Sequence, residues 1–145
     1  MTALQTPAAS RREHYVSVAG RVLLALIFVM SGLGKIPGWE RTSGMMAQAG
    51  MPLVPLFLAG AIVLEIGGGL LLLTGWRPRW GAIALMIFLV PATFLFHNFW
   101  AYQGQEQQMQ MISFLKNLSI FGGLLYVFAT SGPGSPRVAR QAAGS

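Results

Sequence analysis

The chain has 145 residues, of which 54% are hydrophobic and only 10% are charged, and it carries a net charge of +6. Soluble globular domains carry about 25% charged residues, so this composition excludes a typical water-soluble domain and indicates a protein in lipid. The lack of cysteine excludes disulfides, iron–sulfur ligation and thiol relays within the chain.

Four long apolar stretches follow one another along the chain. Each has about 20 residues or more, enough for a helix to cross a hydrocarbon core about 30 Å thick. Because backbone polar groups in lipid must be satisfied within the segment, we predict an all-α bundle of four transmembrane helices forming a single membrane domain. The predicted spans are residues 16–36, 51–75, 80–102 and 109–130, with disordered tails at 1–10 and 131–145.

The connections between the spans are short and contain helix-breaking or polar residues. Pro37 and Gly38 are predicted to end the first helix, and the mildly amphipathic residues 42–50 are expected along the membrane interface. Residues 75–80 form a tight turn between the second and third spans, and the glutamine-rich residues 103–108 separate the third from the fourth.

The basic residues lie at the edges of the apolar stretches, which favours contact with lipid headgroups over nucleic acid binding. The side that holds both termini and the turn at 75–80 carries most of the arginines. The other side carries Lys35 and Arg41, with Lys116 inside a span near that face. The positive-inside rule therefore predicts cytoplasmic N- and C-termini, in a multi-pass protein of the cytoplasmic (inner) membrane.

Besides Arg21, which is expected to extend to the inner headgroups, four charged or histidine residues lie inside the predicted spans or near their ends. Charged residues there cost about 2.5–3.5 kcal/mol each on insertion scales, so they need a partner or a function. Lys35, His97 and Lys116 are expected in the outer half of the bundle, and Glu65 near the middle of the second span. Because an unpaired carboxylate at that depth is very costly, we expect Glu65 to pair with a buried cation, Lys116 in the first place and otherwise Lys35.

Helical spacing adds two further candidate site residues. Asn117 follows Lys116 on the fourth span, and Trp100 is expected on the same face of the third span as His97. Two interpretations of the polar cluster stay open: a ligand pocket, or an ion pair that sets helix register beside a packed core histidine. No metal site is predicted, because Glu65 is the one further buried ligand that His97 would have. No catalytic residue is assigned, and whether the chain is an enzyme stays open.

The order and spacing of these residues resemble the DoxX family of small four-helix membrane proteins from bacteria and archaea. The resemblance covers about residues 18–128. It rests on Arg21, Gly32-Leu33-Gly34-Lys35, Glu65 with Gly67-Gly68-Gly69, Phe96-His97-Asn98-Phe99-Trp100, and Lys116-Asn117 with Gly122-Gly123-Leu124-Leu125. It implies a membrane redox accessory protein near a quinone. The chain has no electron carrier of its own, so a bound quinone or a partner would supply it.

Three hypotheses of function follow. The leading one is a subunit or accessory of a membrane oxidoreductase system, whose polar pocket opens to the outer side. There Lys35, His97 and Lys116 contact a quinone or small anion, Glu65 balances their charge, and Trp100 stacks on a ring. The second is a small carrier or channel for an anion, a lipid or protons, which at this length would form a homo-oligomer. The third is a structural membrane anchor for soluble partners, redox proteins among them.

Overall fold

The computed structural model describes residues 7–132, and all of their regular secondary structure is helical. The elements are α1 (Pro7–Lys35), α2 (Trp39–Gln48), α3 (Val54–Thr74), α4 (Pro78–Phe96), the short 3-10 helix η1 (Phe99–Ala101) and α5 (Gly104–Thr130). Four segments of this part of the chain, residues 11–35, 54–74, 78–101 and 104–130, are long and apolar enough to cross a membrane. The predicted all-α fold with four membrane-spanning helices is confirmed.

The first helix begins earlier than predicted. α1 starts at Pro7 rather than at Val16, so residues 7–10 are helical and do not belong to a disordered tail. Proline is tolerated at the first helical position because its missing N–H has no partner there in any case, and the alanines and arginines that follow are good helix formers. Of the predicted C-terminal tail, Ser131 and Gly132 are described and follow the end of α5 at Thr130. The remaining predicted tail residues, 1–6 and 133–145, lie outside the described residues.

The turn between the third and fourth spans also lies elsewhere than predicted. α4 ends at Phe96 rather than at Tyr102, and α5 begins at Gly104 rather than at Met109. The glutamine-rich segment is thus the first turn and a half of α5, because glutamine and glutamate are good helix formers. Residues 97–103 are left to reverse the chain.

The connection between α1 and α3 contains a helix of its own. Ile36, Pro37 and Gly38 separate α1 from α2, which begins at Trp39. The Thr42 hydroxyl donates a hydrogen bond to the Gly38 carbonyl at 2.9 Å. Leu53 before α3 has a left-handed backbone conformation with φ 49°. Through these turns α2 folds back beside α3, and its Met46 side chain is buried.

The long helices pack at close range through glycine. A Cβ built at Gly69 of α3 would lie 2.6 Å from Cγ2 of Val29 on α1. A Cβ at Gly81 of α4 would lie 2.7 Å from the Gly68 carbonyl oxygen of α3. Small residues let membrane helices approach until their backbones touch, and dispersion between the close surfaces then holds them together.

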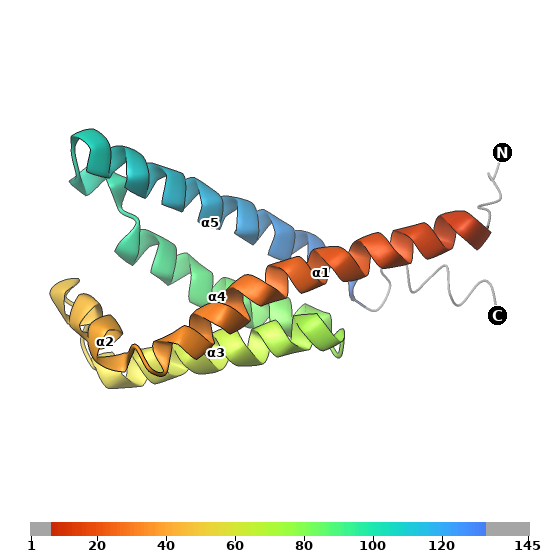
Figure 1. Ribbon diagram of the computed structural model, residues 1–145, viewed down its shortest axis with the longest axis horizontal. Coiled ribbons are helices and arrows are strands. Elements are labelled where there is room, and N and C mark those ends of the chain that lie inside the picture. Colours follow the sequence, from red (N-terminus) through yellow and green to blue (C-terminus); the bar gives the residue numbers. More distant parts are fainter. Residues whose placement is uncertain (1–6, 133–145) are drawn as a thin grey trace.

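The helices form two pairs that diverge toward one end of the molecule (Figure 1). α1 packs along α3 and α4 along α5, while α3 and α4 join the two pairs through their shared contact. The pairs are close at the α3–α4 turn and separate toward the end where α2 lies. The core cluster consists of Ala25, Phe28, Leu72, Ala82, Leu85, Leu89, Leu124 and Val127. Many other large apolar side chains face outward, which suits helices whose solvent is lipid.

Candidate functional site

A cavity of about 930 Å³ lies between the diverging helix pairs. α1 to α5 all contribute to its wall, and Met45 and Met46 of α2 lie on one side of it. Small-molecule sites in proteins have volumes of about 300–1,000 Å³ and are mostly apolar with a few polar groups. Most of this lining is apolar, and its polar or ionisable side chains are those of Ser31, Lys35, Thr42, Glu65, His97 and Asn117.

The centre of the polar lining is an ion pair between α1 and α3. Nζ of Lys35 lies 2.8 Å from Oε2 of Glu65, and it donates hydrogen bonds to Oε1 of Glu65 at 3.0 Å and to Oγ of Ser31 at 2.7 Å. The approach to Oε2 lacks hydrogen-bond geometry, so within residues 7–132 that oxygen has an ionic contact but no hydrogen bond. The Glu65 side chain is 1% exposed and that of Lys35 is 21% exposed. The pair therefore neutralises its own charge in the cavity wall.

The predicted pair of Glu65 with Lys116 is wrong. Lys116 lies on an exposed face of α5 and is not among the residues that line the cavity. The next residue, Asn117, lines it instead. Successive residues of a helix point about 100° apart, so a helix that turns Asn117 inward turns Lys116 toward the surrounding lipid. Depth along the span had suggested Lys116, but depth does not determine the direction in which a side chain points.

His97 lies at the end of α4 and lines the cavity. Its Nδ1 is 2.9 Å from Oε1 of Gln110 on α5. An amide oxygen can only accept, so Nδ1 is the donor, and in the neutral ring Nε2 is then an acceptor. The bond joins the two helices near their turn and sets the orientation of the ring. Gln110, near the start of the predicted fourth span, was not among the predicted site residues.

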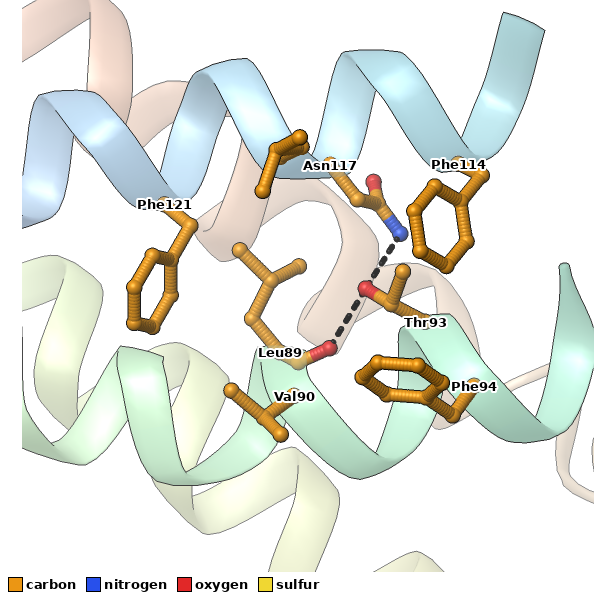
Figure 2. A pocket seen from close by; sticks show the side chains of 8 residues that line it. Leu89, Val90, Thr93, Phe94, Phe114, Asn117 and Phe121 are labelled. Atoms are coloured by element: carbon orange, nitrogen blue, oxygen red, sulfur yellow. Dashed lines mark hydrogen bonds between the residues drawn. The ribbon is translucent and has the colours of Figure 1, made fainter. Parts of the chain in front are cut away.

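Asn117 takes part in a short hydrogen-bond chain that crosses from α5 to α4 (Figure 2). Its Nδ2 donates to Oγ1 of Thr93 at 3.0 Å, and that hydroxyl donates to the Leu89 carbonyl at 2.6 Å. Thr93 is buried. A second, smaller cavity of about 170 Å³ lies on the other side of this chain, between rings of Phe94, Phe114 and Phe121. Asn117 therefore lines both cavities.

Trp100 lies away from the main cavity. It belongs to η1, is 56% exposed, and contacts the rings of Phe94, Phe99 and Phe114 with centroids 5.2–6.4 Å apart. The expectation that Trp100 shares a face with His97 assumed a continuous helix. Because α4 ends at Phe96, helical spacing no longer relates the two residues.

The residues of α2 were missing from the predicted site. Thr42, Met45 and Met46 line the cavity because α2 folds back against α3. The amphipathic pattern of residues 42–50 was a usable signal, since its apolar face needs a surface to cover. Within residues 7–132 no three histidine, aspartate or glutamate side chains come together as metal ligands.

Comparison with known proteins identifies the family. The family described as DoxX matches residues 16–98, which include Lys35, Glu65 and His97. The chain is also 35% identical to the inner membrane protein YqjF of Escherichia coli over 125 residues, which are 85% of this chain and 88% of the relative. The chain belongs to the DoxX family.

Two further relatives are similar to the chain. The chain is 31% identical to the inner membrane protein YphA of Escherichia coli, over 83% of its own length and 86% of the relative. It is 27% identical to the ER-derived vesicles protein ERV29 of Saccharomyces cerevisiae, over 83% of its own length but only 32% of that protein. No solved structure matches the chain.

Proposed function

We propose that this DoxX protein binds a membrane-soluble molecule with a polar ring, a quinone, in the cavity between its helix pairs. In this proposal it serves as a subunit or accessory of a membrane oxidoreductase system. The observation that carries the proposal is the buried Lys35–Glu65 ion pair in the wall of a largely apolar cavity of about 930 Å³. Such a site combines an apolar volume for hydrocarbon with fixed hydrogen-bonding groups for ring oxygens.

The charge balance of the cavity favours a neutral ligand over a small anion. The positive charge of Lys35 is neutralised by Glu65, and Lys116 lies outside the cavity. A desolvated anion would require an unbalanced cation, since burial of a charge without a partner is expensive. A quinone requires only donors for its carbonyl oxygens, and the Lys35 ammonium and the Ser31 hydroxyl supply them.

The location proposed for the protein is the inner membrane, with both termini in the cytoplasm. Two relatives are named inner membrane proteins, and five of the six arginines in residues 7–132, all except Arg41 on α2, lie on α1 or at the α3–α4 turn. The α3–α4 turn lies at the end of the bundle where α5 ends. The positive-inside rule assigns that end to the cytoplasm. The cavity, together with α2, then lies toward the outer face.

The test is retention of quinone by the purified protein. The wild-type protein and the Lys35→Met and Lys116→Met variants are purified in mild detergent, and their bound small molecules are extracted and identified by mass spectrometry. Lys35→Met removes the donor in the cavity wall, whereas Lys116→Met removes the same charge from an exposed position on α5. We expect quinone with the wild type and with Lys116→Met, and at least about a tenfold loss with Lys35→Met, the equivalent of 1.4 kcal/mol.

Three results would contradict the proposal. Equal quinone in the two lysine variants would show that it is carried by detergent and lipid rather than by the cavity. Retention of a small anion or a phospholipid in the cavity would favour a carrier. Retention of no molecule at all, even after addition of a short-chain quinone, would favour a structural anchor.

A further inference from the structure

A group of arginines lies at the end of the bundle opposite the wide end of the cavity. Arg21 comes from α1, and Arg77 and Arg79 flank Pro78 at the start of α4, so the three arginines come from two parts of the chain. Arg21 reaches the α3–α4 turn directly, because its Nη1 and Nη2 lie 2.8 Å and 3.0 Å from a Cβ built at Gly75. We call Arg21, Arg77 and Arg79 the arginine cluster.

Arg21 has one N–H group that makes no hydrogen bond within the described chain. It is half-buried, and its Nε is buried without a hydrogen-bond partner in the described chain. Gly75 ends α3 in the left-handed region with φ 73°, which leaves space for the guanidinium beside that helix end. The guanidinium of Arg21 therefore has a hydrogen-bond donor that no group of the described chain satisfies, and such unsatisfied donors are rare in folded proteins.

Arg79 is fixed against the end of α5. Its guanidinium carbon lies 4.4 Å from the centroid of the Phe128 ring on α5, and its Nη1 lies 2.7 Å from a Cβ built at Gly132. Arg77 adopts a left-handed backbone with φ 50°, and its guanidinium lies 5.6 Å from the Trp76 ring centroid. Stacking on a ring orients a guanidinium while leaving its N–H donors available at the edge.

The acidic residues of the chain lie away from the arginine cluster and do not balance its positive charge. The chain has four acidic residues, and of these Glu40, Glu65 and Glu106 lie on α2, in the cavity wall and at the start of α5. Glu13 lies on α1, eight residues or about 12 Å before Arg21 along the helix. The described part of this end also carries Arg11 and Arg12, so its net charge is strongly positive.

We infer that the arginine cluster is a binding site for one acidic phospholipid, whose phosphate contacts Arg21 and Arg79. Guanidinium groups bind phosphate oxygens through paired donors, and basic pockets between transmembrane helices suit anionic headgroups. Trp76 and Trp80 flank the cluster, are 67% and 60% exposed, and suit the headgroup level of a bilayer. This inference is independent of the quinone proposal, because the cluster and the cavity's polar lining lie toward opposite ends of α1 and α3.

The surroundings favour a lipid over a soluble phosphate. Exposed apolar side chains such as Leu70 and Leu73 continue from the cluster along α3 and offer a surface for acyl chains. In phosphatidylglycerol the phosphate charge is not balanced by an ammonium, whereas a zwitterionic lipid carries an ammonium that the arginines would repel.

The experiment measures lipid binding to delipidated, detergent-purified protein by native mass spectrometry. Phosphatidylglycerol, phosphatidylcholine and inorganic phosphate are added separately at the same phosphate concentration. We expect one phosphatidylglycerol to bind the wild type, with phosphatidylcholine at least about tenfold weaker, since arginines near the headgroups attract anionic lipids. The Arg21→Gln/Arg79→Gln double variant should lose this preference.

The matched control is Arg11→Gln/Arg12→Gln, which removes the same charge from exposed positions on the same end of α1. It should bind phosphatidylglycerol as the wild type does. An equal loss in both double variants would overturn the inference, because it would reduce binding to general electrostatic attraction. Saturation by inorganic phosphate alone, with no preference for the lipid, would overturn it as well.

Two additions keep this test decisive. If Arg21→Gln/Arg79→Gln does not fold, Arg79→Gln alone is used, and an unchanged lipid preference in that variant contradicts the inference. Quinone retention is measured on the same preparations and should not change in either double variant. Loss of lipid preference with quinone retained supports the lipid site irrespective of what the cavity binds.

Discussion

Nζ of Lys35 on α1 lies 2.8 Å from Oε2 of Glu65 on α3, so an ion pair connects the two helices in the cavity wall. The carboxylate is almost fully enclosed, whereas the lysine side chain is 21% exposed. The two partners should therefore respond differently to replacement.

We predict that Lys35→Met destabilises the bundle more than Glu65→Gln does. The first change leaves an enclosed carboxylate without a cation, a loss of about 3–5 kcal/mol. The second leaves an ammonium that is partly exposed and can reorient. Unfolding followed by circular dichroism in mixed micelles measures both variants and the double variant. The cycle should give a coupling energy of about 0.5–3 kcal/mol, while additive effects would show that the contact contributes no coupling. Lys116→Met, on the exposed face of α5, is the control and should be nearly neutral.

A second prediction concerns the contact between α3 and α4. Gly81→Ala should destabilise the protein, because the new methyl would lie 2.7 Å from the Gly68 carbonyl oxygen, a backbone atom that cannot yield without moving the helix. Gly67→Ala on the lipid-facing side of α3 meets no atom within 4 Å, so it should be neutral or stabilise by about 0.5–1 kcal/mol. Thermal unfolding of the two variants measures both changes in stability. Equal effects would mean that helix propensity, and not close packing, governs both positions.

The third prediction separates a binding role of His97 from a structural one. His97→Ala removes both the ring in the cavity and the 2.9 Å bond to Gln110, whereas Gln110→Leu removes only the bond. If the ring binds ligand, His97→Ala should lower quinone retention at least about tenfold, the equivalent of 1.4 kcal/mol, and Gln110→Leu should lower it less. Both variants should lose similar stability, about 1 kcal/mol for the shared bond. Unaltered retention in folded His97→Ala protein would show that the residue is purely structural.

A fourth prediction concerns the hydrogen-bond chain in Figure 2. Thr93→Val should destabilise the α4–α5 contact by about 0.6–1.7 kcal/mol, because it removes the acceptor of Asn117 and a donor to the Leu89 carbonyl. Ser119→Ala removes a hydroxyl that bonds only to its own helix, at the Leu115 carbonyl, on an exposed face of α5. Chemical unfolding in micelles should show a larger loss for Thr93→Val than for Ser119→Ala, and the reverse order would be inconsistent with the described contact.

The fifth prediction is the membrane topology. Reporter domains or labels placed at Ser145 and at Gln105 should lie on opposite sides of the membrane, with Ser145 in the cytoplasm. The physical reason is the concentration of arginine at the end of the bundle that carries the α3–α4 turn. Finding both positions on the same side would contradict the topology and the outward opening of the cavity.

The sequence alone determined the number of spanning helices, the helical class and the family. These properties follow from local features: runs of about 20 apolar residues, proline and glycine at the turns, and a recurring order of polar residues. It also singled out Lys35, Glu65, His97 and Asn117, all of which line one cavity. Polar residues inside apolar runs are few, and each must be enclosed by the bundle to be tolerated.

Only the tertiary structure decided which of these residues meet. Glu65 pairs with Lys35 and not with Lys116, because the packing of α5 turns Asn117 inward and its neighbour outward. Trp100 is separated from the cavity because α4 ends at Phe96, and α2 forms part of the wall because its chain folds back. The depth of a residue in a span can be counted from the sequence. Its direction depends on how each helix is rotated against its neighbours, and that rotation is set by close contacts between residues far apart in the chain.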